Sequence, residues 1–219
     1  MTIFKRKEMN AETLKLSVII AVHDQAELLE QNLPKFFTQE GEVAYEVIVV
    51  DDSSTDDTPD VLKRMKAEYP NLYTTFLPQS KVPNPSRRRL ALTIGAKAAH
   101  HSWIVMADIS RPPLSDTWFS DLVSNISSSS EVVMSYGDKR TTIQSFDSLD
   151  EASPLIRKAE RTSGKGHRGR FFAFRRGLYH TTAFKKEQIH DAIKLYDLKI
   201  KGSQLAGLRL KVVWKNLFE

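Results

Sequence analysis

The chain has 219 residues, of which 41% are hydrophobic and 27% charged, which is enough for one α/β domain with a sizeable core. It contains no cysteine, so disulfides, thiolate catalysis and cysteine-ligated zinc or iron–sulfur sites are excluded. The net charge of +5 permits anionic partners such as nucleotides, nucleic acid or lipid headgroups without choosing among them.

The predicted elements alternate between strands and helices as far as residue 136. After a loose, charged arm at residues 1–14, we expect strands at 16–22, 45–50, 72–77, 103–107 and 131–136, and helices at 26–37, 59–69, 87–100 and 116–126. This order predicts a three-layer α/β/α, Rossmann-like fold around a mostly parallel central sheet.

The pattern changes after residue 137. Residues 138–170 are polar, basic and irregular, with a helix near 149–161, and we expect a strand at 171–174, a helix at 187–201 and a last strand at 208–213. The sequence therefore predicts a single domain at 15–219, with one half at 15–136 and the other at 137–219.

The most informative segment is the end of the second strand. Residues 47–50 are an unbroken β-branched run that stops at Asp51 and Asp52, as in a strand buried on both faces of a parallel sheet. The two carboxylates then lie at the carboxyl end of the strand, where open α/β sheets bind their ligands. Because the two acids repel each other, we expect a ligand with hydrogen-bond donors, such as a nucleobase or ribose, to compensate them.

Helix caps are a plainer interpretation of the same turns. Asp24 is expected to cap the helix at 26–37, and Asp57 or Thr58 fits an N-cap before Pro59. The cap at Asp57 or Thr58 does not explain the acidic pair, which lies too far upstream of it.

Several motifs follow one another in a fixed order along the chain. The first strand ends in Ala21-Val22-His23-Asp24-Gln25, the second in Val49-Val50-Asp51-Asp52-Ser53-Ser54-Thr55-Asp56, an arginine-led helix begins at residue 87, and the fourth strand ends in Asp108-Ile109-Ser110, before Pro113 and Trp118. In combination they resemble the family 2 glycosyltransferases of the GT-A fold, strongly over residues 16–136 and more loosely to residue 213.

The resemblance implies a transferase that moves a sugar, with inversion, from a nucleotide-diphosphate sugar to a glycan or lipid-linked acceptor, as in polysaccharide biosynthesis. The donor is expected to be a UDP-sugar. The implied donor-binding residues are Ala21, His23, Asp24, Asp51, Asp52, Arg88, Arg89 and Asp108.

The roles of these residues follow from the family motifs. The acidic pair would accept a hydrogen bond from the base, commonly uracil N3–H, and a charged acceptor strengthens that bond. His23 could stack on or hydrogen-bond the base, or be an ordinary polar residue at a strand end. Which of the three arginines at 87–89 contacts the donor stays open.

The fourth-strand motif departs from the family pattern. The family has Asp-x-Asp there, and its last carboxylate ligates Mg²⁺ or Mn²⁺ on the diphosphate, whereas here the two metal-site positions are Asp108 and Ser110. A neutral hydroxyl is a poor replacement for a hard anionic ligand. Asp108 and the diphosphate could still hold a metal with water, basic residues at 87–89 or Arg111 could replace it, or the reaction has been lost.

The resemblance also implies a general base in the second half. The family has Glu-Asp at the start of a helix, with a glycine eleven residues after the Asp; here His190 and Asp191 begin the matching helix and Gly202 follows at that spacing. Asp191 would deprotonate the acceptor hydroxyl. The alternative is a first-turn helix acid favoured by the helix dipole.

Two functions from different classes therefore stay open. One is an active glycosyltransferase; the other is a catalytically impaired GT-A-like binding or scaffold protein in a glycan-assembly complex, favoured by the departures at Ala21, Ser110 and His190. A nucleotidyltransferase would prefer a glycine-rich phosphate loop after the first strand, and residues 21–25 contain no glycine. No nucleic-acid partner is expected, because basic residues are mixed with acids and no basic stripe rich in aromatics occurs.

The expected location is the cytoplasm, which the absence of cysteine fits. The longest apolar runs, residues 18–22 and 47–50, are far too short to span a bilayer, and the polar residues 1–15 lack the apolar core of a signal peptide. Residues 157–176 carry eight Lys or Arg, which would suit a phosphorylated acceptor, peripheral contact with a membrane's inner face, or a solvated loop over the active site.

Overall fold

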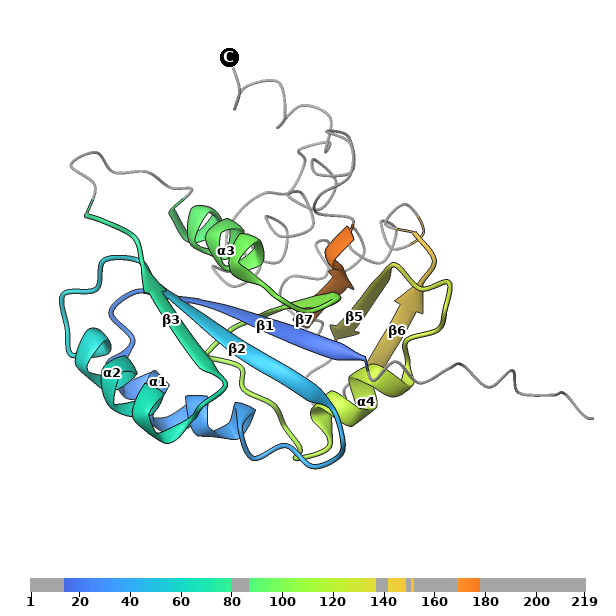
Figure 1. Ribbon diagram of the computed structural model, residues 1–219, viewed down its shortest axis with the longest axis horizontal. Helices are drawn as coiled ribbons and strands as arrows, with labels where there is room; N and C mark the ends of the chain where they lie inside the picture. Colours follow the sequence, from blue (N-terminus) through green and yellow to red (C-terminus); the bar gives the residue numbers. More distant parts are fainter. Residues whose placement is uncertain (1–13, 80–86, 137–141, 149–150, 152–168, 178–219) are drawn as a thin grey trace, which may run out of the picture.

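The computed structural model describes residues 14–79, 87–136, 142–148, 151 and 169–177. These residues form a seven-stranded sheet in the order β3-β2-β1-β4-β7-β5-β6 (Figure 1). The expected helices near 149–161 and 187–201, the strand at 208–213 and the N-terminal arm lie outside the described residues, apart from residues 14 and 151.

The sheet has a parallel half and an antiparallel half. The parallel strands are β1 (Lys15–Val22), β2 (Ala44–Asp51), β3 (Leu72–Phe76) and β4 (Trp103–Ala107). The antiparallel strands are β5 (Val132–Tyr136), β6 (Thr142–Phe146) and β7 (Gly169–Arg175). The α/β fold with a central sheet that is mostly parallel in its core is therefore confirmed.

One strand contradicts the sequence interpretation. Strand β6 lies in a segment predicted to be irregular, yet it pairs along its whole length with β5. Phe146 is buried in the apolar cluster on one face of the sheet and Ile143 packs against the cluster on the other face, while the residues between them are polar. The prediction failed because a short strand with a mostly polar sequence has too little apolar periodicity to recognise.

The helices are α1 (Ala26–Asn32), α2 (Thr58–Glu68), α3 (Arg87–Ala98) and α4 (Trp118–Ser124), with a 3₁₀ turn, η1 (Leu33–Phe36), directly after α1. The single helix expected at 26–37 is thus divided in two. Pro34 is the reason: it has no N–H to donate to the α-helical ladder and its ring crowds the preceding turn, so it sits in the first turn of η1.

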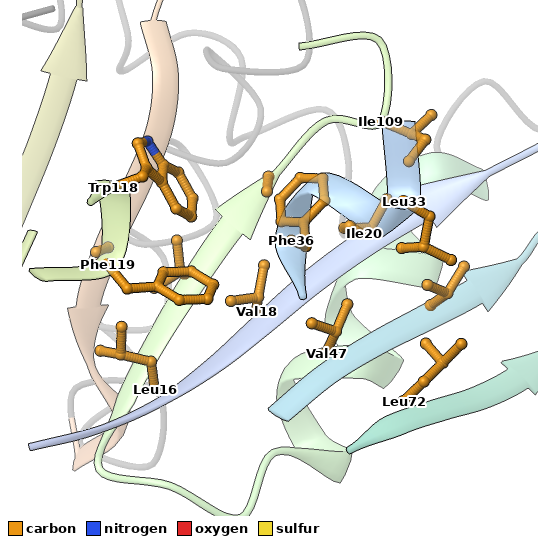
Figure 2. Close-up of a cluster of buried hydrophobic side chains, with 14 of the residues drawn as sticks. Leu16, Val18, Ile20, Leu33, Phe36, Val47, Leu72, Ile109, Trp118 and Phe119 are labelled. Atoms are coloured by element: carbon orange, nitrogen blue, oxygen red, sulfur yellow. The ribbon is translucent and has the colours of Figure 1, made fainter. Parts of the chain in front are cut away.

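The helices cover both faces of the sheet, as Figure 1 shows: α3 lies over one face, and α1, α2 and α4 lie over the other. Strand β1 is buried on both sides and separates two apolar clusters. Figure 2 shows the cluster on the α1, α2 and α4 side, where Phe36 and Trp118 meet edge to face. This three-layer arrangement explains why the strands read as continuous apolar runs.

Helix α3 approaches the sheet closely at Gly95. A Cβ at this position would lie 2.3 Å from Ile19 Cγ2 on β1 and 3.3 Å from Val50 Cγ2 on β2. The absence of a side chain therefore sets how near α3 lies to β1 and β2, and it brings the amino end of α3 close to the carboxyl ends of those strands.

The chain reverses direction beside β1. From β1 it proceeds outward through β2 and β3, then returns to add β4 on the other side of β1. The crevice at such a reversal, at the carboxyl ends of the strands, is where open α/β sheets bind ligands. Within the described residues, no helix is long and apolar enough to cross a membrane.

The opposite, amino edge of the sheet holds a buried acid that the sequence analysis did not single out. Glu46 is 3% exposed and accepts hydrogen bonds from Ser17 Oγ (2.5 Å), from the backbone N–H of His100 (2.8 Å) and from His100 Nδ1 (2.8 Å). Ser17 Oγ in turn accepts the backbone N–H of His101 (3.1 Å). We call Ser17, Glu46, His100 and His101 the amino-edge cluster; it ties the chain between α3 and β4 to β1 and β2.

The amino-edge cluster keeps its acid ionised. Burial alone would raise the pKa of Glu46, but the hydrogen bonds from Ser17 and His100 outweigh it and the pKa is lowered from its ordinary value. Burial lowers the pKa of His101, against the opposing attraction of Glu46.

Candidate functional site

Three buried carboxyl groups gather at the carboxyl edge of the sheet. Asp51 ends β2, Asp52 follows it, and Asp108 follows β4; they are 6%, 9% and 1% exposed, respectively. Strand β1 lies between β2 and β4, so the acids follow the strands on either side of β1, at the chain reversal. We call this set, with the arginines described below, the carboxyl-edge site.

The adjacent acids are compensated by the protein itself. Arg87 Nε lies 2.6 Å and its Nη2 2.5 Å from Asp52 Oδ1, while Asp51 Oδ1 accepts the backbone N–H (3.0 Å) and the hydroxyl (2.5 Å) of Ser54. Arg87 Nη2 also donates to Ser53 Oγ (2.7 Å) and to the Pro78 carbonyl (3.0 Å). The hydrogen-bond donors that were expected from a ligand are thus already supplied by the protein, and they fix both carboxylates in place.

The loop after β1 is locked to the loop after β2. Asp24 has a left-handed backbone (φ = 49°), and its Oδ1 accepts the N–H of Thr55 (2.7 Å) and of Asp56 (3.4 Å). The hydrogen bond from the Thr55 backbone is the main reason that the pKa of Asp24 is lowered. Its carboxylate therefore holds the second loop.

The expected helix caps lack their side-chain hydrogen bonds, although Asp57 stands at the N-cap of α2 as predicted. Asp24 does not cap α1; Asp56 Oδ2 accepts the Ala26 N–H (3.0 Å) and Thr58 Oγ1 accepts the Gln25 N–H (3.1 Å) instead. At α2 the N-cap position has no side-chain cap bond, and Asp56 Oδ1 accepts the Thr58 N–H (3.0 Å). The physical reason is that Asp24 and Asp56 each hold the other loop, so the start of α1 is capped from the loop after β2, whereas α2 is capped by Asp56 from within its own loop.

His23 links the same two strand ends. Its Nδ1 lies 2.7 Å from the carbonyl oxygen of Asp52, and since a carbonyl can only accept, Nδ1 carries the proton. Nε2 lies 3.5 Å from Asp24 Oδ2, and the side chain is 58% exposed. The ring is therefore oriented by the backbone and still accessible to a ligand.

The turn after β4 folds back on its own acid. Asp108 Oδ1 accepts the N–H of Ser110 (3.0 Å), and the Asp108 carbonyl accepts the N–H of Arg111 (2.9 Å). Ile109 is fully buried, and its carbonyl accepts a hydrogen bond from Asn32 Nδ2 (3.0 Å). This anchoring leaves Ser110 exposed at the tip of the turn.

Arg88 connects the carboxyl ends of β1 and β4. Its Nη1 donates to the Ala21 carbonyl (3.1 Å), and its Nη2 lies 4.0 Å from Asp108 Oδ1. The arginine side chain is 18% exposed and that of Asp108 2%. Ala21 therefore contributes through its backbone, and Arg88 brings a positive charge to the buried carboxylate.

The described part of the chain does not contain the metal site that the resemblance implies. No group of three His, Cys, Asp or Glu in that part could hold a metal ion. Asp108 is engaged by Arg88 and by the Ser110 N–H, and position 110 offers only a neutral hydroxyl. These residues do not fit a two-carboxylate site for a hard divalent cation.

Two predicted site residues cannot be assigned a contact, and one residue of the site was not predicted. The side chain of Arg89 and all of Asp191 lie outside what the structure describes. Arg87, which the sequence analysis did not select from the arginine triplet, is the residue that holds Asp52. Helical geometry is the signal that was missed: neighbouring helix positions point about 100° apart, so Arg87 and Arg88 reach different strand ends.

Comparisons with known proteins agree with this architecture. The family model described as glycosyl transferase family 2 matches residues 17–214. The mannosyltransferase PcManGT from Pyrobaculum calidifontis, solved with GDP-Man and Mn²⁺, superposes with a TM-score of 0.53 at 22% identity, over 75% of this chain and 45% of that one. TarS 1–349 from S. aureus, solved with UDP-GlcNAc, gives 0.52 at 20% identity, over 76% and 47%. At these identities the solved structures show the fold alone, and the predicted GT-A fold is confirmed.

Curated relatives match a shorter part of the chain. Uncharacterized proteins of Mycobacterium tuberculosis and Mycobacterium bovis are 34% identical over 67 residues, which is 31% of this chain and 19% of theirs. The chain thus spans about a fifth of these relatives and less than half of PcManGT or of TarS 1–349 in its UDP-GlcNAc complex.

Proposed function

The chain belongs to glycosyl transferase family 2, and from this premise we propose that it transfers a sugar from a nucleotide-diphosphate sugar to a glycan or lipid-linked acceptor, with inversion. The observation that carries the proposal is the carboxyl-edge site, in which Asp51, Asp52 and Asp108 lie at the ends of the strands on either side of β1. A ligand crevice at that edge, lined by fixed acceptors, suits a nucleotide with donor groups on its base and ribose.

The proposed donor is UDP-linked. PcManGT was solved with GDP-Man and TarS with UDP-GlcNAc, so these structures leave the base open. Asp51 and Asp52 are proposed to read the base, with His23 beside them as a stacking or hydrogen-bonding ring. Arg87 and Ser54 hold the two carboxylates before the ligand arrives, which lowers the ordering cost of binding.

The chemical step is assigned by family motif. Asp191 is proposed as the general base that takes the proton from the acceptor hydroxyl, while Arg88, Arg89 and Asp108 contact the donor. In an inverting transfer, the acceptor oxygen attacks the anomeric carbon as the nucleoside diphosphate leaves from the opposite face. Positive charge near the diphosphate stabilises that leaving group.

A binding experiment tests this proposal first. UDP, GDP, ADP and CDP are titrated into the protein by calorimetry, and we expect UDP to bind most tightly. Asp51→Asn should weaken UDP binding about tenfold, because a hydrogen bond to a charged acceptor is replaced by one to a neutral amide. Asp60→Asn, at an exposed position of α2, is the matched control and should change nothing. Absence of binding by every nucleotide would refute the proposed function.

A second function is favoured by one observation, the exposed hydroxyl of Ser110 where the family has a carboxylate. It is a GT-A-like protein that binds the nucleotide sugar inside a glycan-assembly complex without transferring it. The two functions differ in turnover. Release of UDP from UDP-sugars in the presence of acceptor glycans supports the transferase, and tight binding without release over many hours supports the binding protein.

A further inference from the structure

The charge balance at Asp108 points to an unusual way of holding the donor. Asp108 is 1% exposed, and an ionised carboxylate is costly to bury unless a positive group or hydrogen bonds offset it. Arg88 Nη2 faces Asp108 Oδ1 at 4.0 Å, the distance of an ion pair. The guanidinium is itself anchored on β1 through the Ala21 carbonyl (3.1 Å), so it is held against the acid by the fold.

A divalent cation would have to compete with this arrangement. One oxygen of Asp108 is occupied by the Ser110 N–H (3.0 Å), and the other is buried, with no hydrogen-bond partner among the described residues. A cation placed at that carboxylate would lie within a few ångströms of the Arg88 guanidinium, and like charges at such distances repel strongly. Position 110 supplies no second anion to offset that repulsion.

We propose that the Arg88 guanidinium is the resident counter-charge of Asp108, so that the nucleotide-diphosphate donor binds without a divalent cation. Besides contacting the donor, Arg88 is in this view a positioning residue: it holds the Asp108 carboxylate in place and brings positive charge to the donor side. The inference rests on the proposed function, since it concerns the donor of that reaction.

The first test needs no variant. UDP is titrated into the wild-type protein by calorimetry, once with EDTA and once with excess Mn²⁺. We expect the two dissociation constants to agree within about twofold. A strengthening of about tenfold or more by Mn²⁺ would overturn the inference while leaving nucleotide binding, and hence the proposed function, intact. No binding of any nucleotide in either buffer would instead refute the proposed function.

The second test asks whether removing the charge of Arg88 makes UDP binding depend on a metal ion. Arg88→Gln removes the counter-charge, so UDP should bind about tenfold more weakly in EDTA and regain affinity with Mn²⁺. Arg88→Lys keeps a positive charge and should still bind without metal. Arg64→Gln removes an arginine that pairs with Glu30 on the exposed surface of α1 and α2, and should behave as the wild type in both buffers.

The result that contradicts the role of Arg88 is equal metal response in Arg88→Gln and the wild type. If Arg88→Gln fails to fold, as judged by circular dichroism, Mn²⁺ alone is titrated into the wild type and followed by electron paramagnetic resonance. Because the Arg88 guanidinium repels a cation at Asp108 and position 110 supplies no second anion, we expect no tight Mn²⁺ binding. Tight binding of Mn²⁺ by the wild type would overturn the inference.

Discussion

The two edges of the sheet both bury carboxylates, and they balance them differently. At the amino edge, Glu46 is surrounded by hydrogen-bond donors from Ser17 and His100, two segments that the sheet itself brings together. At the carboxyl edge, Asp52 and Asp108 face arginines at the start of α3. Hydrogen-bond donors on neighbouring segments hold one acid in place, whereas arginine side chains bring positive charge to the acids of the other edge. The first arrangement suits stability and the second suits ligand binding.

The largest expected effect is a loss of stability when the acid of the amino-edge cluster is removed. Glu46→Ala should lower the free energy of unfolding by about 3 kcal/mol, because the buried Ser17 hydroxyl and the backbone N–H of His100 lose their acceptor. Urea unfolding measures this, with Glu42→Ala, on the exposed side of the preceding loop, as control. UDP binding by the folded variant should be unchanged, since the cluster lies at the other end of the strands. A parallel loss of UDP affinity would show that the two edges are not separable.

The next effect concerns the carboxyl edge alone. Arg87→Lys should weaken UDP binding about tenfold, because one ammonium cannot reproduce the guanidinium's simultaneous contacts with Asp52, Ser53 and the Pro78 carbonyl. The melting temperature should change little, because Lys keeps the charge. Arg64→Lys, in the exposed pair with Glu30, is the control for the substitution itself. If Arg87→Lys instead mainly lowers the melting temperature, the arginine pair belongs to the stability of the fold.

The sequence was most informative where a single strand carries the signal. The apolar run before Asp51 predicts a doubly buried strand, and its abrupt end predicts acids at the carboxyl edge; both features are present in the structure. The amino-edge cluster was missed because it depends on register: Ser17 and Glu46 are direct partners on neighbouring strands, although each looks like an isolated polar residue in an apolar run.

The hydrogen bonds of the two loops were harder to predict, because they too join residues that are far apart in the sequence. Asp24 had a local role available as a cap, but its carboxylate crosses to the other loop, about 30 residues away in sequence. Asp56 does both, because one oxygen caps α2 and the other accepts a hydrogen bond from the distant loop. Local propensity cannot choose between a near donor and a distant one. The arginines at 87–89 could be predicted in part. Their charge predicted contacts with the donor, but only the helix geometry explains why Arg87 contacts Asp52 and Arg88 lies beside Asp108.

A smaller effect is expected from acid titration of the amino edge. The pKa of Glu46 is lowered in the folded protein from its ordinary value of 4.5, so its contribution is complete above that value and is lost as the pH falls through the folded pKa. Glu46→Gln cannot titrate there. The difference in unfolding free energy between wild type and Glu46→Gln should therefore shrink below pH 4.5. A difference that stays constant with pH would contradict the lowered pKa.

The smallest effect belongs to His101 and lies in a separate pH window. Burial lowers its pKa in the folded protein from the ordinary value of 6.5, so the unfolded chain binds a proton first as the pH falls. The stability that neutral His101 contributes is complete above 6.5 and is lost as the pH drops from there through the folded pKa. His101→Gln should remove this first step and keep the later one that Glu46 causes, because its backbone N–H still reaches Ser17 Oγ. Urea unfolding of the variant at a series of pH values separates the two steps; a first step that persists in His101→Gln would assign it to another group.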